Sequence, residues 1–482
     1  MKFTFIPQVE KQKSDLLVIP FWEGPKAAAD YGSFQLEGLL DFTGKNGETC
    51  FCYEKGERIL LIGLGKQEAA TIEALRKAYS SVVRATQAKK IKHIAVLFPK
   101  CKQKEEFFQG LVEGLLLTSY SFTYKKHALK ENPIVLLEKV TLIGIEETAL
   151  LAKLETICTG VHFVRDLINA NADEKTEQLI SAAKKLHPKI KTTIFNKKKL
   201  EDEKMGLILA VNRSSTVDPC LIQSAYRGNP KSKEHIVLVG KGVTYDTGGL
   251  SLKPTDGMLT MKCDMSGAAT VLGAVKIAAE LGLKVNVTAL APVTENCIGS
   301  KSYKLGDVYH SYSGKTVEIN NTDAEGRLIL ADALSYAVEN LKPTYMIDLA
   351  TLTGACVVAL GEDIAGLFSN NDTLAEELLE SSDRTDELIW RLPIHNEYKD
   401  SFKSEIADLV NSGGREAGAT KAAIFLQEFV GETPWAHLDI AGPAYLSKPK
   451  HYNPTKGTGH CVRLLVDFLQ RQSQNSTTEK NR

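Results

Sequence analysis

The 482-residue chain lacks the features expected of a membrane protein or of a secreted protein held together by disulfides. Its most apolar window, residues 349–361, is about 13 residues long, whereas a membrane-spanning helix needs roughly 20. The nine cysteines are scattered, and only Cys50 and Cys52 lie close together. The first residues contain no long apolar region before a small-residue cleavage site, so we expect no signal peptide. The sequence therefore predicts a reduced, cytoplasmic protein with no membrane partner.

The chain also lacks net charge. It has 59 Lys plus Arg and 59 Asp plus Glu, so its formal net charge is zero. A neutral chain does not offer the general basic surface of a nucleic-acid-binding protein, and we expect no nucleic-acid partner. The basic stretches 84–104 and 184–199 are local exceptions. Lysines on solvated faces explain these stretches as well as a binding partner does. A nucleic-acid-binding regulator stays a minor alternative, to be decided by a salt-dependent binding assay.

Four common functional motifs are absent. There is no H-E-x-x-H helix and no C-x-x-C pair, the usual signatures of zinc sites. The segment 63–65 resembles the start of a dinucleotide-binding turn, but Glu68 stands where the third glycine belongs. Gly240-Lys241 is not a P-loop, because Gly242 stands where Ser or Thr is needed. The chemistry must therefore be carried by other residues.

What the chain does contain is an alternation of strand-like apolar runs with segments of helical spacing, which predicts an α/β fold. At roughly 100–200 residues per domain, we expect two or three domains. We predict a smaller N-terminal α/β/α domain over 1–146, a long linker helix over 147–171, and a larger C-terminal α/β/α domain over 172–482. Predicted strands cover 16–20, 59–62, 94–98, 140–144, 192–195, 236–239, 285–290, 345–349 and 435–438. Predicted helices cover 68–88, 105–118, 175–186, 265–281, 328–340, 420–430 and 460–471.

The most informative stretch is Asn321–Leu328, which reads N-T-D-A-E-G-R-L. Residues i, i+2 and i+4 share one face of a strand but not of a helix. If Asp323, Glu325 and Arg327 act together, the segment is extended, and a helix begins only at Leu328. Two carboxylates and a guanidinium suit a metal ion together with a bound anion. For an isolated D-x-E-x-R, a surface turn with a local ion pair is the alternative.

Two further carboxylates belong to the same interpretation. Asp246 lies in the glycine-rich loop 240–254, directly after a predicted buried strand, where α/β proteins bind ligands. Asp264 precedes an alanine-rich helix, so it could be a helix N-cap, a metal ligand or both, because helix N-termini also favour anions. Together with Asp323 and Glu325 they form a carboxylate set without histidine, which suits two divalent ions that share bridging carboxylates.

The cationic residues complete this set. Nearby metal ions would depress the pKa of an amine, so Lys241 could serve as a neutral ligand. Lys253 and Arg327 would stay charged and hold developing oxyanion charge and a small anion. A metal-free hydrolase with Ser251 as nucleophile and Lys253 as base is an alternative, but it leaves the carboxylates unexplained.

At this point the sequence resembles a known family. Asn321–Leu328 matches in full the signature of the leucyl aminopeptidases, the cytosol aminopeptidase family, and residues 239–253 with Asp264 match its second conserved block. The resemblance covers about 170–482 well and residues 1–150 only in pattern. It implies a di-metal aminopeptidase that removes N-terminal residues, preferably leucine and other apolar ones, from peptide substrates. It also implies a homohexamer and makes 172–482 the catalytic domain.

The resemblance further implies roles for individual residues. Asp246 and Glu325 would bridge both ions, Lys241 and Asp264 would complete one site, and Asp323 the other. The ions would be Mn²⁺ or Zn²⁺. Lys253 and Arg327 would be the catalytic pair, with a bicarbonate held at Arg327. The pocket for the first side chain would be lined by Met261, Thr351, Gly354 and Ala441, and the Leu352 carbonyl would receive the free amine.

The chain departs from the family pattern in two places. Asn169–Ala172 lacks the usual proline, and the chain is about one residue shorter than many relatives near Lys456–Gly459. Neither place includes a proposed ligand, so both concern the shape of loops.

Overall fold

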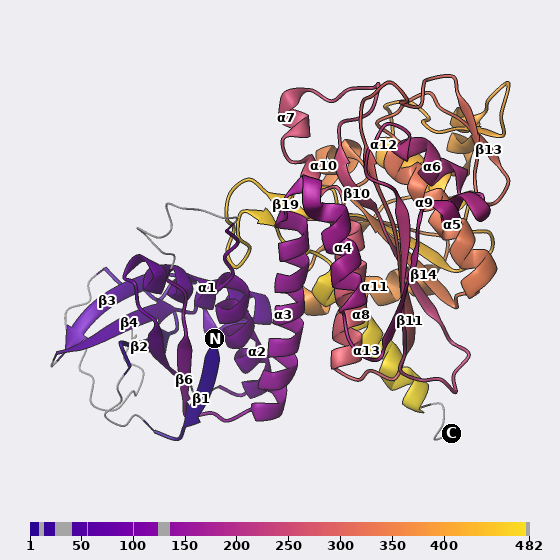
Figure 1. Ribbon diagram of the computed structural model, residues 1–482. Coiled ribbons are helices and arrows are strands. Elements are labelled where there is room, and N and C mark those ends of the chain that lie inside the picture. Colours follow the sequence, from indigo (N-terminus) through magenta and orange to yellow (C-terminus); the bar gives the residue numbers. More distant parts are fainter. Residues whose placement is uncertain (9–13, 25–40, 55, 100, 124–134, 479–482) are drawn as a thin grey trace. The chain divides into compact units, whose positions relative to one another are not determined.

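The computed structural model describes residues 1–8, 14–24, 41–54, 56–99, 101–123 and 135–478. The chain has the predicted α/β character and divides into two compact units (Figure 1). Unit 1 comprises Met1–Thr159 with Lys448–Thr455, and unit 2 comprises Gly160–Ser447 with Lys456–Arg482. The predicted long helix is α3, Thr148–Asn169, which begins in unit 1 and ends in unit 2.

None of the helices in the described part of the chain is both long and apolar enough to cross a membrane.

Unit 1 is built on a six-stranded sheet of order β1-β6-β5-β2-β4-β3, parallel except for β3, which runs antiparallel to β4. Apolar residues of α1 and α2 pack on one face of this sheet and form its larger core. The strands are β1 Lys2–Ile6, β2 Leu16–Phe21, β3 Thr49–Glu54, β4 Glu57–Gly63, β5 His93–Leu97 and β6 Lys139–Ile143, and the helices are α1 Ile72–Ala88 and α2 Lys104–Thr118.

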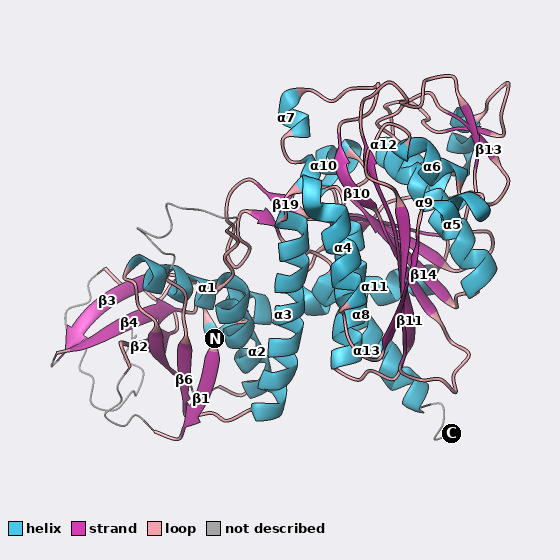
Figure 2. Cartoon of the chain, in the orientation of Figure 1, coloured by secondary structure: helices cyan, strands magenta, loops and turns pink. Residues whose placement is uncertain are grey.

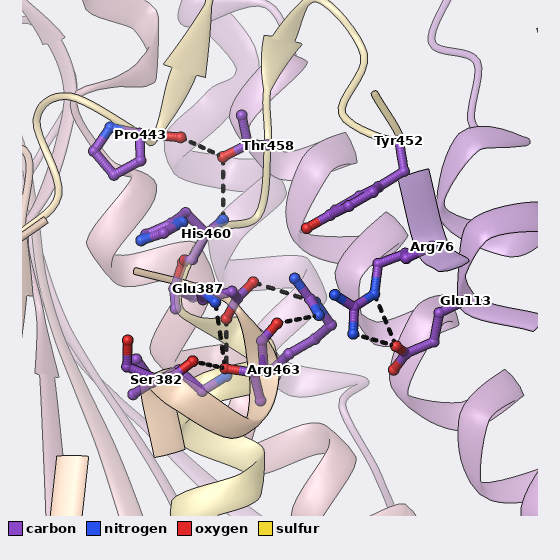
Figure 3. Close-up of polar contacts among 12 residues, drawn as sticks. Arg76, Glu113, Ser382, Glu387, Pro443, Tyr452, Thr458, His460 and Arg463 are labelled. Carbon is purple, nitrogen blue, oxygen red and sulfur yellow. Dashed lines mark hydrogen bonds and ion pairs between the residues drawn. The ribbon is translucent and has the colours of Figure 1, made fainter. Parts of the chain in front are cut away.

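A buried ion pair joins these two helices. The Arg76 guanidinium on α1 donates to Glu113 on α2, with Nη2–Oε2 at 2.7 Å, and both side chains are almost fully buried (Figure 3). The ring of Tyr452 lies 5.4 Å from the Arg76 Cζ atom, and the Tyr452 hydroxyl donates to Glu73 at 3.1 Å. These contacts place the segment Lys448–Thr455, late in the sequence, within unit 1.

Unit 2 is a three-layer sandwich around a nine-stranded sheet, and its elements are seen in Figure 2. The sheet strands are β7 Ile190–Phe195, β8 Cys220–Arg227, β9 Ile236–Gly240, β10 Gly242–Asp246, β11 Asn286–Asn296, β14 Tyr345–Ala350, β15 Ala365–Ser369, β16 Ile389–Arg391 and β18 Trp435–Asp439. The helices are α4 Lys175–Lys184, α5 Lys197–Asp202, α6 Gly206–Asn212, α7 Thr255–Met258, α8 Ser266–Glu280, α9 Glu325–Tyr336, α10 Gly354–Leu360, α11 Asp372–Thr385, α12 Gly418–Gln427 and α13 Val462–Thr478. Short strands β12 Val308–His310, β13 Thr316–Glu318, β17 Leu409–Val410, β19 Tyr445–Leu446 and β20 Lys456–Gly457 form two small sheets.

The centre of this sheet is parallel. The strand order is β16-β15-β18-β14-β9-β11-β8-β7, and β10 pairs with the end of β11. The neighbours β18, β14, β9 and β11 all run in the same direction, with Ala350 beside Asp439 and Leu349 beside Gly240. Helices α8, α11 and α13 lie over one face, and α6, α9 and α12 lie over the other. Because the central strands are parallel, their carboxyl ends open on one edge of the sheet.

Every strand predicted from sequence overlaps a strand of the structure, but one prediction at the signature stretch is wrong. Asp323, Glu325 and Arg327 were expected on one extended segment, with the helix beginning at Leu328. Helix α9 instead begins at Glu325, so Glu325 and Arg327 belong to its first turn. The reason lies in the fold: the Asn411 side chain binds the Asn321 carbonyl at 2.6 Å and holds the preceding turn in place.

Candidate active site

The parallel strands bring polar residues together at one edge of the unit 2 sheet. Strand β9 leads directly into Lys241, β10 ends at Asp246, and β11 ends at Asn296. Thr351 follows β14, which pairs with β9. This edge is where open α/β sheets bind their ligands, because the loops after neighbouring strands diverge there. The residues that the sequence analysis singled out therefore meet where a ligand site is expected.

Three carboxylates form the centre of the site. Asp246, Asp323 and Glu325 each offer an oxygen, and these oxygens lie within 4.8 Å of one another. Asp246 is held in place by Asn296 Nδ2 and by the Gly248 N–H, which both donate to its Oδ1 at 2.8 Å. Burial raises the pKa of Asp246, and repulsion from Glu325 raises it further. Such a cluster binds cations, since a positive charge relieves this repulsion.

Lys241 and Asp264 adjoin this cluster. The Lys241 ammonium donates to Asp264 Oδ1 at 2.8 Å, to Glu325 Oε1 at 2.9 Å and to the Thr351 carbonyl at 2.9 Å. Burial alone lowers the pKa of Lys241, but Asp264 and Glu325 outweigh it and raise that pKa above its ordinary value. The amine is thus a charged donor here, and it would have to lose a proton before it could act as a metal ligand.

The helix-cap alternative for Asp264 is not what the structure shows. Its carboxylate is directed to Lys241 and also accepts from Thr351 Oγ1 at 2.7 Å. Helix α8 begins at Ser266 with Met265 as its N-cap and without a side-chain cap hydrogen bond. Burial raises the pKa of Asp264 well above its ordinary range, although Lys241 opposes the shift. Asp264 therefore faces the cluster.

Lys253 lies on the other side of the cluster. Its ammonium is 3.0 Å from Asp246 Oδ2 and 2.5 Å from Asp323 Oδ1. Burial would lower the pKa of Lys253, but Asp246 and Glu325 raise it above its usual value. A charged lysine cannot serve as the base of a Ser–Lys pair. The Ser251 hydroxyl instead accepts from the Thr322 N–H at 3.1 Å, so it holds the loop.

Two glycines make room for the cluster, Gly326 beside Lys241 and Gly248 beside Asp323. A side chain at Gly326 would place its Cβ only 2.6 Å from Lys241 Cε and 2.7 Å from Lys241 Nζ. Gly248 has φ of +83°, and a Cβ there would lie 2.8 Å from Asp323 Oδ1. Only glycine combines this backbone conformation with such a close approach. The glycine content of both motifs thus follows from how tightly the cluster is packed.

Arg327 is buried, in the first turn of α9, two residues after Glu325. Its Nη1 donates to the Asn411 carbonyl at 3.0 Å, while its buried Nε has no hydrogen-bond partner within the described structure. Burial lowers the pKa of Arg327 to about 10, although Glu325 and Asp439 oppose the shift. The guanidinium therefore stays charged near neutral pH and keeps an unused donor, as an anion site requires.

The residues predicted to bind the substrate lie around the same edge. Met261 belongs to the short 3₁₀ helix Met261–Cys263 directly before Asp264. Thr351 touches Asp264 and Lys241, and Gly354 begins helix α10. The Leu352 and Ala441 N–H groups both donate to Asp439 Oδ1, at 3.1 and 3.2 Å. The five predicted residues thus lie on the loops after β14 and β18 and on the turn before α8.

Several residues that shape the site were not predicted from the sequence. Asn296 holds Asp246, Asn411 holds the turn before Glu325, and Asp439 holds two loops. Asn296 and Asp439 are the last residues of parallel strands. Because ligands bind beyond the carboxyl ends of such strands, this position could have identified both as residues of the site. Asn411 follows the short strand β17, and its local sequence offers no comparable signal.

The donor set fits divalent metal ions. Asp264 Oδ2 and Glu325 Oε2 are buried oxygens without a hydrogen-bond partner in the part of the chain described. An unpaired buried carboxylate oxygen is costly unless it binds a cation. Carboxylate-rich sites without cysteine suit hard or borderline ions such as Mn²⁺ and Zn²⁺. Asp246, Asp264, Asp323 and Glu325 are thus the residues able to hold such ions.

An acidic cluster of this kind, at the carboxyl edge of an α/β/α sandwich, fits the class of metal-dependent enzymes. Residues 162–466 match the catalytic-domain model of the cytosol aminopeptidase family, and residues 35–128 match its N-terminal-domain model. The chain is 49% identical to a probable cytosol aminopeptidase of Protochlamydia amoebophila (strain UWE25), over 98% of this chain and 99% of that relative. The chain belongs to the cytosol aminopeptidase family and is a metallo-aminopeptidase.

Solved structures agree with this assignment. A mutant of tomato leucine aminopeptidase superposes with a TM-score of 0.85 and 32% identity, over 98% of this chain and 96% of that one. The bottromycin maturation enzyme BotP in complex with Mn superposes with a TM-score of 0.85 and 30% identity, over 95% of this chain and 100% of that one. The likeness extends over both units of the chain.

Proposed function

We propose that this aminopeptidase uses two divalent metal ions, Mn²⁺ or Zn²⁺, to release N-terminal leucine and other apolar residues from peptides. The observation that carries the proposal is the histidine-free cluster, in which Asp246, Asp323 and Glu325 offer oxygens within 4.8 Å of one another. Asp246 and Glu325 lie centrally and would bridge the ions, with Asp264 and Lys241 on one side and Asp323 on the other. The Mn complex of the structural neighbour BotP supports such a site.

The bound ions would supply Lewis acidity, which lowers the pKa of a coordinated water to about 7. The protein would supply the rest of the chemistry. The Lys253 ammonium, beside Asp246 and Asp323, would donate to the oxyanion that develops on the scissile carbonyl. Arg327, with its unused Nε donor, would hold a bicarbonate close enough to carry a proton to the leaving amine.

The loops after β14 and β18 would form the substrate pocket. Thr351, Gly354 and Ala441, with Met261 opposite, would surround the first side chain, and the Leu352 carbonyl would accept from the free amine. The name of the tomato neighbour, a leucine aminopeptidase, supports a preference for leucine.

Assembly and location belong to the same proposal. Leu259, Val358 and Ile406 are 77%, 89% and 66% exposed, and contacts between copies in a homohexamer would be one way to bury them. All nine cysteines are free thiols, which suits the reducing cytoplasm.

The test combines metal analysis with two substrates. Exhaustive chelation should abolish hydrolysis of leucine amide, and Mn²⁺, Zn²⁺ or Co²⁺ should restore it. N-acetyl-leucine amide should not be hydrolysed, because it has no free amine to bind. Full activity with metal content verified near zero, or equal rates on the two substrates, would refute the proposal.

A further inference from the structure

We propose that Asp439 is a positioning residue for the active site, which fixes the loop after β14 and through it Asp264 and Lys241. The inference rests on the proposed di-metal function and extends it to a residue that touches neither a proposed ion nor the substrate. Asp439 is the last residue of β18 and is fully buried.

The Asp439 carboxylate joins two loops. Its Oδ1 accepts from the Leu352 N–H at 3.1 Å, on the loop after β14, and from the Ala441 N–H at 3.2 Å, on the loop after β18. Its Oδ2 accepts from Thr353 Oγ1 at 2.7 Å. The same Thr353 hydroxyl accepts from the Cys356 N–H at 3.0 Å and so caps helix α10. One side chain therefore sets the geometry of the whole segment 352–356.

A single peptide group carries this effect to the candidate metal ligands. The Leu352 N–H that donates to Asp439 and the Thr351 carbonyl that accepts from Lys241 belong to the same peptide unit. A peptide unit is planar and rigid, so its N–H and its C=O cannot be reoriented separately. The Asp439 contact at one end thus fixes the direction of the carbonyl at the other.

Thr351 provides a second route. Its Oγ1 donates to Asp264 Oδ1 at 2.7 Å, and this leaves Asp264 Oδ2 without a hydrogen-bond partner in the described structure. If the loop shifts, Asp264 and Lys241 lose this partner together. Asp246 and Asp323 are positioned by other segments, and Glu325 is held by the start of α9 as well as by Lys241, so these three should keep their places. The effect is therefore expected at one ion site only.

The second loop has its own anchor. Thr458 Oγ1 donates to the Pro443 carbonyl at 2.6 Å (Figure 3). The Thr458 N–H donates to the Ala444 carbonyl at 3.1 Å. The His460 N–H in turn donates to Thr458 Oγ1 at 3.1 Å. The loop after β18 is thus held by contacts that do not involve Asp439. Asp439 therefore lies beside a fixed loop and can position the loop after β14 relative to it.

The chain contains a matched control in Asp348. It is also fully buried and lies on β14, the strand that pairs with β18. Its carboxylate is bound by Trp435 Nε1 at 2.7 Å and by His437 Nδ1 at 2.6 Å, both within the sheet layer. Asp348→Asn therefore makes the same chemical change at a comparable depth, away from the loops.

The experiment is a Mn²⁺ titration of the full-length enzyme against a competing chelating dye. Wild type should bind two ions, and Asp439→Asn should bind one normally and the other about 10- to 100-fold more weakly, as for a lost outer-shell partner. Its KM for leucine amide should rise more than its kcat falls at saturating Mn²⁺. Asp348→Asn should lower the melting temperature and leave both affinities unchanged.

Thr353→Val removes one donor to Asp439 and serves if Asp439→Asn does not fold; it should weaken the same ion. The inference would be overturned if Asp439→Asn bound both ions with wild-type affinity. If Asp439→Asn does not fold, the same result in Thr353→Val would overturn it. Equal weakening by Asp348→Asn would do so as well, because the effect would then come from the sheet in general. A wild-type protein that binds no ion at all would overturn the proposed function itself, an outcome distinct from the others.

Discussion

Lys175 should make the stability of the catalytic unit depend on pH. It is the first residue of α4, and its side chain is fully buried. Its ammonium donates to the Ile168 carbonyl at 2.7 Å and to the Lys262 carbonyl, and neither acceptor is charged. Burial lowers the pKa of Lys175 to about 7. Two smaller effects oppose each other, because the Cys263 thiol raises this pKa and the Lys262 ammonium lowers it.

The sign and size of the effect follow from the two pKa values. An unfolded lysine has a pKa of about 10.4, so between pH ~7 and pH ~10.4 the unfolded chain binds more protons than the folded one. Stability therefore rises with pH in this window and is lost as the pH falls toward 7. From proton binding to Lys175 in the folded and unfolded states, the free energy of unfolding should rise by about 2.5 kcal/mol between pH ~6.5 and pH ~9. This corresponds to roughly 5 °C in melting temperature.

Lys175→Met keeps the length of the side chain and removes its charge, so this pH-dependent gain should disappear. The assay is urea unfolding of metal-free protein across the same pH range, followed by circular dichroism and tryptophan fluorescence. Lys184→Met, an exposed position on the same helix, should behave like wild type. If wild type and Lys175→Met show the same pH dependence, the burial argument is wrong.

Three further predictions concern the candidate site. Glu325→Ala should bind well below two Mn²⁺ per chain at any practical concentration, whereas Asp323→Ala should keep about one tight ion; equal stoichiometry by mass spectrometry would show that this stretch is not the metal centre. Lys241→Ala should lose metal and activity together, whereas Lys253→Ala should keep its metal and lose roughly 10²–10³ in kcat, and the reverse pattern would exchange their roles. Arg327→Ala should keep both ions and be rescued poorly by added bicarbonate; loss of metal from this variant would contradict an anion-binding role.

Local sequence was a good guide to the strands and to the acidic motifs, because both depend on patterns within a few residues. The run 236–239 is continuous and apolar, and 345–349 is apolar except for the buried Asp348, because parallel central strands are buried on both faces. Strand β7, at the edge of the sheet, and β8, next to it, are antiparallel to their neighbours. Strand β8 was not predicted, and neither were β1, β3, β10, β15 and β16. The β8 sequence from Cys220 to Arg227 mixes polar and apolar residues, since only part of it lies in the core.

The start of α9 could not be derived from its own residues. Asn411 lies 90 residues beyond Asn321 along the chain, yet its side chain binds the Asn321 carbonyl and its Oδ1 accepts from the Asn320 N–H at 2.9 Å. A tertiary contact thus fixes the turn that lets the helix begin at Glu325. The expectation that Asp323 and Glu325 act together did not require an extended strand, because a turn followed by a helix start also brings their oxygens within 4.8 Å.

Asp439 and Asp246 show what sequence position leaves undecided. Each is the last residue of a parallel strand in the same sheet, and each is buried. Position alone would assign both to the ligand set. The donors around them separate the two: Asp439 has both oxygens engaged by the N–H and O–H groups of loops, whereas Asp246 Oδ2 faces the Lys253 ammonium and the other carboxylates. An aspartate at the end of such a strand can therefore hold either an ion or the loop that surrounds the ion, and only its neighbours in space decide which.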